Sequence, residues 1–284
     1  MVIVIICRTK KLHSSTNIFV ASLAVNDLIF SGFFIVMWIT TTRIRWSSVT
    51  LAKLMSTIMY CLCSGTTNQS IMHMAAIAID RYIHIAHPFY YMKHAAKHRV
   101  YIIVTILWIA GIALTTIPPV IFTPKLECVN LISHQPAAYY FPGASVYVIT
   151  VPLVCFCYSK IACLAFRHKL AANARRARTD ELLTDIQQRN NRQAALRSVQ
   201  FVALMFGVFT ACTLPQFVST GMSFLITIPE KIYLGFFLFA PIHSVINFLI
   251  FATMNREFSS ALMEALLKYN CLNVRNENRA QRTS

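Results

Sequence analysis

The chain has 284 residues, of which 56% are hydrophobic and only 13% charged, and it carries a formal net charge of +16. This composition excludes an ordinary soluble domain and favours a membrane protein. Only α-helices and closed β-barrels satisfy their backbone hydrogen bonds in lipid, and barrel strands alternate over about ten residues. The apolar stretches here are longer and apolar all round, so we expect an all-α membrane protein.

The sequence lacks the residue patterns of several other function classes. Its nine cysteines form no zinc-ligand pattern. It has no Ser–His–Asp spacing, phosphate loop or paired carboxylates, so we expect no enzymatic activity. Only Asp27, His73 and His243 are ionisable groups of the kind that line a transporter or channel pathway, which disfavours that function. Residues 1–7 are apolar but too short for a cleavable signal peptide.

The basic residues gather on one side of the predicted spans. Of 26 lysines and arginines, 21 fall on one face, which leaves Arg43, Arg45, Lys53, Lys125 and Lys231 on the other. Basic loops stay cytoplasmic. We therefore expect a multi-pass plasma-membrane protein with its basic loops and C-terminus in the cytoplasm. The positive charge is explained without nucleic acid, which is not expected as a partner.

The apolar runs predict a seven-transmembrane helix bundle over residues 1–254. A spanning helix needs about 20 apolar residues, so residues 1–7 are interpreted as the end of a first helix whose opening half is absent. The other predicted spans are 17–40, 52–83, 100–122, 139–166, 194–226 and 231–253.

Prolines mark the joints of these helices. Pro118 and Pro119 are expected to end the fourth span, Pro152 to bend the fifth and Pro215 to kink the sixth.

Polar segments separate and follow the spans. A linker of mixed charge at about 168–191 joins the fifth and sixth spans on the cytoplasmic side. Residues 255–269 alternate polar and apolar residues with helical spacing, which predicts an amphipathic surface helix against the membrane lipid. Residues 270–284 then form a cytoplasmic tail.

The third span closes on Asp80, Arg81 and Tyr82, with Pro88 and Phe89 shortly after. An acid–base pair at the end of an apolar run lies where lipid meets water, because charge is costly at the bilayer centre. The tripeptide resembles the motif that closes the third helix of rhodopsin-like (class A) G-protein-coupled receptors. This resemblance implies that Asp80 holds Arg81 at rest and that Arg81 turns towards a heterotrimeric G protein on activation. Pro88 and Phe89 would present an apolar knob to the G protein or pack at the membrane edge.

Other spans carry motifs similar to those of the same family, in the same order. They are an aspartate in the second span, a tryptophan in the fourth, a Phe–Cys–Pro pattern in the sixth and an Asn-initiated motif in the seventh: Asp27, Trp108, Phe209, Cys212, Pro215, and Asn247 to Phe251. These motifs cover nearly the whole chain, so it is identified as a member of the family, with the first helix truncated.

The resemblance implies a polar network around Asp27. Family members hold a sodium ion and water beside this carboxylate, and the matching oxygen donors here are Ser70, Ser244 and Asn247. The alternative is a protonated Asp27 in a hydrogen-bond network without an ion.

Other roles are also implied by the resemblance. The sixth helix moves about a hinge, and Tyr158, Asn247 and Phe251 belong to the activation switch. Cys271 is either palmitoylated or an inert thiol, and arrestin is a further expected partner. The hinge residues are Phe209, Cys212, Thr213 and Pro215.

The sequence departs from the family pattern at several positions. Thr213 replaces the usual tryptophan before the sixth-helix proline, and Phe248 and Phe251 replace the proline and tyrosine of the seventh. Cys128 has no partner in register, so its pairing stays open. With the partial first helix, these departures favour an alternative: a non-signalling, truncated or decayed receptor that acts only as a membrane partner protein.

The inner end of the sixth span lacks the acid that many relatives offer to the third-helix arginine. No Asp or Glu lies between Asp185 and Glu230, and Arg192 and Arg197 lie at that end. We therefore expect a weaker inactive-state clamp on Arg81 and raised basal signalling.

The predicted ligand site lies in the outer half of the bundle. Where amine receptors carry an aspartate, this chain has Cys63, followed by Thr66 and Thr67, and no acid lies between Asp27 and Asp80. A biogenic amine is therefore disfavoured, and an opsin as well, since no lysine is placed for a retinal Schiff base. Aromatic and polar side chains would line an apolar pocket or simply pack the helices: Gln216, Phe217, Phe236 and Phe237.

Overall fold

The computed structural model describes residues 15–43, 48–94, 97–122, 137–176, 182–254 and 258–264. Every element named within these ranges is an α-helix. Five of the described helices are long and apolar enough to cross a membrane. The predicted all-α helical bundle is thus confirmed, while the partial first helix at residues 1–7 lies outside the described residues.

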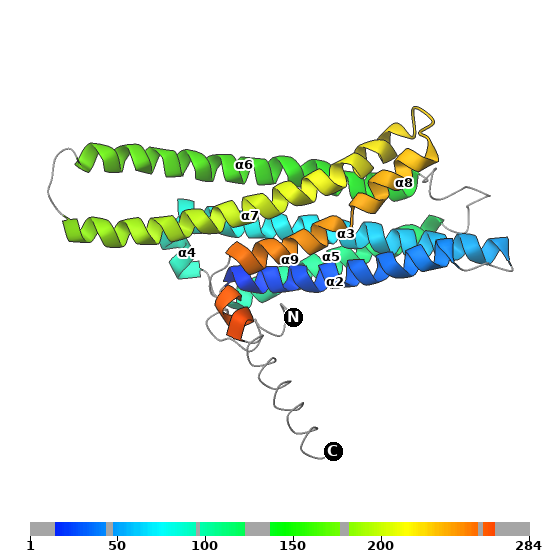
Figure 1. Cartoon of the computed structure of the whole chain (residues 1–284), viewed down its shortest axis with the longest axis horizontal. Helices are drawn as coiled ribbons and strands as arrows, with labels where there is room; N and C mark the ends of the chain where they lie inside the picture. The colour runs from blue at the N-terminus through cyan, green and yellow to red at the C-terminus, as the bar shows by residue number, and fades with distance from the viewer. Residues whose placement is uncertain are drawn as a thin grey trace, which may run out of the picture.

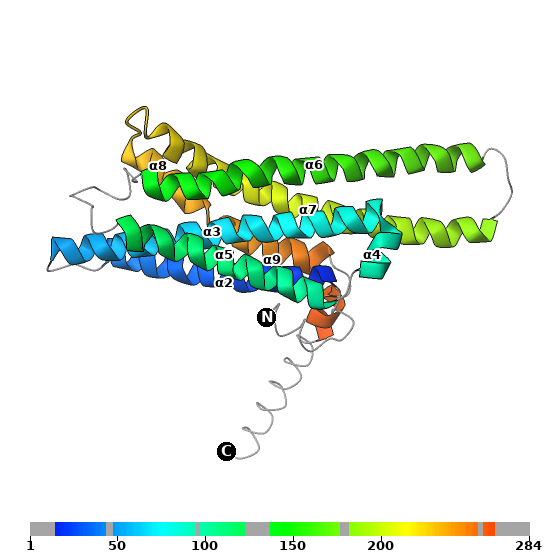
Figure 2. The ribbon, with the colours of Figure 1, turned by 180° about the vertical axis from the view of Figure 1, so that it is seen from behind.

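The long helices run side by side along the long axis of the molecule (Figures 1 and 2). α3 lies at the centre, where it contacts α2, α5, α6 and α7. The shorter α4 follows α3 directly. Their bounds are α2 Ser15–Thr42, α3 Val49–Ala86, α4 Pro88–His94, α5 Lys97–Phe122, α6 Ala137–Arg176 and α7 Leu182–Met222.

The seventh span is divided into α8 (Glu230–Phe239) and α9 (Ile242–Met254). The span predicted at 231–253 therefore contains a break that the sequence analysis did not predict. The break falls at Pro241, which has no N–H to donate and whose ring clashes with the preceding turn. Across it the backbone makes i→i+3 hydrogen bonds instead, from the N–H of His243 to the oxygen of Ala240 (3.4 Å) and from Ser244 to Pro241 (3.2 Å).

α5 ends at Phe122, the end predicted for the fourth span, after passing through Pro118 and Pro119. Each proline removes only its own N–H, and its carbonyl still accepts a hydrogen bond, so a helix can continue for part of a turn beyond it. α6 and α7 extend into the predicted linker, to Arg176 and from Leu182, and both project beyond the other helices at the left of Figure 1.

Part of the predicted surface helix is described, as a helical stretch at 258–264 that turns away from α9 (Figure 1). Phe258 is fully buried at its start, and its ring lies 4.4 Å from that of Phe251. Met263 on the same stretch is exposed. The rest of the predicted helix at 265–269 and Cys271 lie outside the described residues.

The bundle carries polar groups inside and apolar side chains outside. Asn26 and His73 are fully buried, whereas Ile109, Val148 and Val245 are exposed by 61–63%. A soluble protein would have this pattern reversed, because water solvates polar groups and excludes apolar ones. Hydrocarbon instead favours apolar side chains outside and leaves the polar groups to pair within the bundle.

Small residues bring α3 and α5 close together. A Cβ atom placed on Gly65 would overlap the side chain and backbone of Thr115, and one on Gly111 would overlap the side chain of Gln69. Glycine at such contacts lets two membrane helices approach through their backbones.

Replacing Gly65 with alanine is expected to destabilise the bundle by about 1–3 kcal/mol, because the added methyl group overpacks the α3–α5 contact. Gly207→Ala is the matched control, since a Cβ there meets nothing within 4 Å. Alanine favours a helix equally at both sites, so the difference isolates the contact. Thermal unfolding of the two purified variants measures it, and equal melting temperatures would contradict the close approach.

Candidate functional site

The predicted acid–base pair at the end of α3 is present in the structure. The Arg81 guanidinium lies 3.2 Å from the Asp80 carboxylate. The two side chains are only 12% and 10% exposed, so the pair is screened from water and its attraction is stronger than at an open surface. The structure thus places the two predicted side chains in contact, and their role as a switch stays a prediction.

Two further residues, which the sequence did not single out, hold the same carboxylate. Thr16 of α2 donates a hydrogen bond to one Asp80 oxygen and Tyr91 of α4 donates to the other, both at 3.1 Å. Burial raises the pKa of the Tyr91 phenol, which keeps the hydroxyl protonated as a donor. Asp80 therefore ties α2, α3 and α4 together at this end of the bundle.

The residues after the pair face outward on α4. Pro88 begins the helix, and Phe89 is 87% exposed. The ring of Tyr82 meets that of His87 edge-on, with centroids 6.2 Å apart. Phe89 is thus an exposed apolar side chain at the same end of the bundle as Arg81.

A second network surrounds Asp27 in the middle of α2. Ser70 of α3 and Asn247 of α9 donate hydrogen bonds to its two oxygens, each at 3.2 Å. Nε2 of His243 lies 3.8 Å from the same carboxylate, a neighbour that the sequence analysis did not place in this network. Ser244 reaches Asp27 only through His243, to which it is hydrogen-bonded at 3.3 Å.

Oxygen atoms without partners lie in this network. Oδ1 of Asn247 and Oδ1 of Asn26 are buried and accept no hydrogen bond from the described residues. The side-chain amide of Asn26 donates hydrogen bonds to the Thr66 carbonyl (2.8 Å) and to the Ser70 hydroxyl (2.7 Å). Carboxylate, hydroxyl and amide oxygens are the donors that a hard cation prefers, so these residues fit a sodium ion.

The residues predicted to form a hinge lie on α7 where it faces α9. Phe209 is fully buried and meets the ring of His243 edge-on, with centroids 4.9 Å apart. Thr213 and Cys212 are also buried, and the Thr213 hydroxyl bonds back to the carbonyl of Phe209 at 2.8 Å. Pro215 follows within the same helix. Phe209 and His243 therefore connect the hinge to the Asp27 network.

Two other residues predicted to belong to the activation switch, Tyr158 and Phe251, are largely or fully buried in the bundle. The hydroxyl of Tyr158 on α6 is buried without a hydrogen-bond partner among the described residues, and it lies within electrostatic range of Arg81. Phe251 is buried against Phe201 and Phe258, at ring distances of 5.8 and 4.4 Å. Phe251 acts here through apolar packing, because it has no hydroxyl to offer Tyr158.

A cavity of about 110 Å³ is lined by the middle of α3, at Cys63 to Asn68, and by the parts of α6 and α7 near Tyr140 and Thr220. It brings together five of the seven predicted ligand-site residues: Cys63, Thr67, Gln216, Phe217 and Phe237. Thr66 and Phe236 do not line it. Thr66 turns inward and bonds to the backbone of α3, whereas Phe236 is 36% exposed on the outside of α8.

Aromatic rings form much of the wall of this cavity. Tyr147 stacks on Phe217 with centroids 4.4 Å apart, and Tyr140 lies 5.6 Å from the same ring. The polar lining is neutral and includes Asn68 and Thr213. None of the described residues that line it is an Asp, Glu, Lys, Arg or His. Tyr140 and Tyr147 were missed because their spacing on α6 also fits ordinary helix packing.

A third buried cluster joins α2, α3 and α5. Nε1 of Trp108 donates to the Ser22 hydroxyl at 2.9 Å, and Nε2 of His73 lies 2.8 Å from the same oxygen. Nδ1 of His73 is bonded to the Gln69 carbonyl at 2.9 Å. His73 is thus satisfied within the protein and packs against Trp108.

These features define a class of protein: a helical membrane bundle with a buried Asp80–Arg81 pair at one end, a polar network around Asp27 in its interior and an aromatic cavity nearer the other end. The family model described as "7 transmembrane receptor (rhodopsin family)" matches residues 1–251. The chain therefore belongs to the rhodopsin family of seven-transmembrane receptors. This confirms the identification made from the motifs, the multi-pass membrane topology and the expectation that the chain is not an enzyme.

Several curated proteins resemble the chain. Over 281 residues it is 24% identical to melatonin receptor type 1C of Xenopus laevis, covering 94% of this chain and 63% of that receptor. Over 161 residues it is 30% identical to 5-hydroxytryptamine receptor 1B of Cricetulus griseus, covering 54% and 40%. A Gq-coupled rhodopsin of Mizuhopecten yessoensis is 33% identical over 125 residues, covering 42% and 23%. The chain spans less than two thirds of the length of each of these relatives.

Proposed function

We propose that the chain is a plasma-membrane receptor that passes the signal of an extracellular ligand to a heterotrimeric G protein. The observation that carries the proposal is the Asp80–Arg81 pair, held by Thr16 and Tyr91 beside the exposed Phe89. Membership of the rhodopsin family supports the same conclusion. The crowding of basic residues at this end favours its placement in the cytoplasm.

The proposed mechanism is an outward movement of α7. A ligand between α3 and α7 would shift Thr213 and Phe209, and Phe209 would transmit the shift to His243 and α9. Displacement of the inner half of α7 would open the space beside Arg81. The guanidinium could then leave Asp80 and contact the G protein together with Phe89.

The resting state is expected to be weakly held. In the described part of α7 no acid follows Asp185, so this part of α7 offers no carboxylate to Arg81. The guanidinium lies 3.2 Å from Asp80, which belongs to the same helix as Arg81. We therefore propose that the receptor is partly active without ligand.

Without ligand, the wild-type receptor is expected to stimulate nucleotide exchange on a purified G protein about tenfold more than the Arg81→Ala variant. This ratio corresponds to about 1.4 kcal/mol. Tyr91→Phe should raise exchange further, because it removes a donor that holds Asp80 in place. Tyr101→Phe is the matched control, since Tyr101 is an exposed tyrosine of α5 that lies outside the cavity lined by Asp80 and Tyr91.

The alternative function predicts a different result in the same assay. A non-signalling membrane partner would give wild-type exchange no higher than that of Arg81→Ala, with or without Tyr91→Phe. The replacements Phe248 and Phe251 in the seventh-helix motif favour this alternative, because Phe251 offers no hydroxyl to the unpaired Tyr158.

The ligand is proposed to be a small neutral molecule with an aromatic ring. The cavity offers stacking rings and neutral amides and hydroxyls. A cation buried there would lose its hydration without gaining a counter-ion, which is costly. At about 110 Å³ the cavity is smaller than the roughly 300–1,000 Å³ of typical ligand sites, so its aromatic walls have to move apart for a larger ligand.

Melatonin and 5-hydroxytryptamine, the ligands named for two relatives, test this proposal as a matched pair. Both are indoles, but only the latter is cationic at neutral pH. We expect melatonin to displace a neutral probe at a lower concentration than 5-hydroxytryptamine does. Gln216→Leu should weaken the binding of melatonin about tenfold, because it removes a hydrogen-bonding amide. Phe236→Leu, outside the cavity, should leave binding unchanged. Tighter binding of the amine would contradict the neutral-ligand proposal.

A sodium ion is proposed to bind beside Asp27. Asp27, Ser70 and the unpaired Oδ1 of Asn247 would hold it, and the ion would supply positive charge to a buried carboxylate. His243 at 3.8 Å is a competitor for the same charge.

Sodium chloride should raise the melting temperature of the wild-type protein relative to choline chloride at equal ionic strength. The free energy of unfolding should rise by about 1.4 kcal/mol when the sodium concentration is about ten times the dissociation constant of the ion. Asp27→Asn should abolish the difference, and His243→Asn should enlarge it. A wild-type protein insensitive to sodium would support the alternative of a protonated Asp27 without an ion.

Two further roles stay predictions: arrestin as a partner, and palmitoylation of Cys271.

A further inference from the structure

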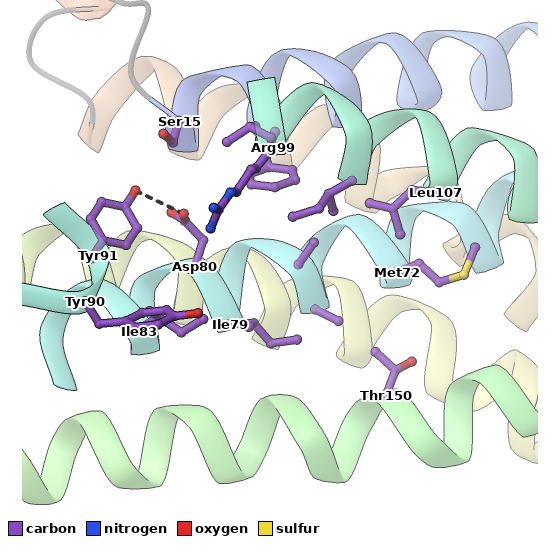
Figure 3. A pocket seen from close by; sticks show the side chains of 15 residues that line it. Ser15, Met72, Ile79, Asp80, Ile83, Tyr90, Tyr91, Arg99, Leu107 and Thr150 are labelled. Carbon is purple, nitrogen blue, oxygen red and sulfur yellow. Dashed lines mark hydrogen bonds between the residues drawn. The ribbon is translucent and has the colours of Figure 1, made fainter. Parts of the chain in front are cut away.

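A second and larger cavity, of about 520 Å³, lies at the same end of the bundle as Arg81. Its walls come from α2, α3, α4, α5 and α6. Figure 3 shows Ser15, Asp80, Tyr91 and Arg99 gathered at one end, and Met72 and Leu107 at the other. The cavity is large enough for a drug-sized ligand, and the proposed receptor function makes no use of it.

Most of this cavity is apolar and faces the surroundings of the bundle. Ile79 and Ile103 are exposed by 36% and 42%, although both line its wall. Both belong to long helices of the bundle, α3 and α5. Tyr90 of α4 is 57% exposed at the mouth. A hydrocarbon chain could therefore enter from the membrane without crossing a polar barrier.

The polar end of the cavity carries an uncompensated positive charge. The Asp80 carboxylate is already occupied by Arg81, Thr16 and Tyr91. Arg99 is exposed, and none of the described acids pairs with its guanidinium. Because Asp80 and Arg81 neutralise each other, the net charge at the mouth is that of Arg99. The mouth is thus complementary to an anionic group.

We propose that this cavity binds an anionic phospholipid of the cytoplasmic leaflet, with one acyl chain inside and the phosphate group at Arg99. The cytoplasmic leaflet is rich in anionic lipids, and each lysine or arginine near its surface gains about 1 kcal/mol from them. Arginine suits a phosphate because its planar guanidinium donates two parallel hydrogen bonds. Apolar walls and a cationic mouth together match such an amphiphile.

The bound chain would act on the arginine switch from the side. Ile83 and Tyr90 line the cavity together with Asp80 and Tyr91. A chain packed against them would fill the space beneath the Tyr91–Asp80 hydrogen bond and restrain α4. The lipid would thus stabilise the resting position of Asp80 without touching the aromatic ligand cavity.

Photo-crosslinking in nanodiscs tests the site without any need for ligand or G protein. The full chain is placed in phosphatidylcholine discs that contain phosphatidylserine with a diazirine in mid-chain, or the same diazirine on phosphatidylcholine. We expect the serine lipid to label peptides around Met72, Ala76 and Leu107 about fivefold more strongly. Arg99→Gln should reduce this labelling to the level of phosphatidylcholine.

Two variants serve as controls. Arg167→Gln removes an exposed charge from α6, away from the cavity, and should leave labelling unchanged. Ala76→Phe fills the cavity and should reduce labelling by both lipids, with the melting temperature as a check of folding. Equal labelling by the two lipids, or no effect of Arg99→Gln, would overturn the proposal. So would displacement of the label by free oleic acid at equimolar concentration, which would assign the cavity to a single-chain carboxylate.

Discussion

Polar side chains within this bundle depend on partners inside the protein, because the surrounding hydrocarbon offers none. Asp27 and Asp80 show the consequence most clearly. Each carboxylate accepts hydrogen bonds from at least two other helices. The helices cannot slide past one another without breaking these bonds, so the two carboxylates fix the register of the bundle. Breaking the hydrogen bonds of either carboxylate would therefore have a large effect on how the helices are placed.

α3 connects all of the functional features. It contributes Ser70 to the core network, Asp80 and Arg81 to the switch, and wall residues to both the aromatic and the lipid-facing cavity. Its contact with α5 depends on backbone approach at Gly65. A central helix held on several sides can serve as the fixed frame against which α7 and α9 move.

The departures from the family pattern are partly offset elsewhere in the fold. The seventh-helix motif has Phe248 where relatives have proline, yet the helix is interrupted at Pro241, about two turns earlier. Next to the break, His243 lies between Phe209 and Asp27. A joint in the seventh span is thus retained at a different position, and an aromatic imidazole couples it to the hinge of α7.

The sequence by itself determined the bundle, its family and the positions of Asp27, Asp80 and Arg81, because long apolar runs and isolated charges have few solutions in a membrane. It could not supply the partners of those charges. Thr16 and Tyr91 meet Asp80 from segments 64 and 11 residues away, and only packing brings such residues together. Likewise, helical spacing gives neither the rotation that turns Thr66 inward and Phe236 outward nor the cavity beside Arg99. Those features depend on how close neighbouring helices lie, which the tertiary structure alone decides.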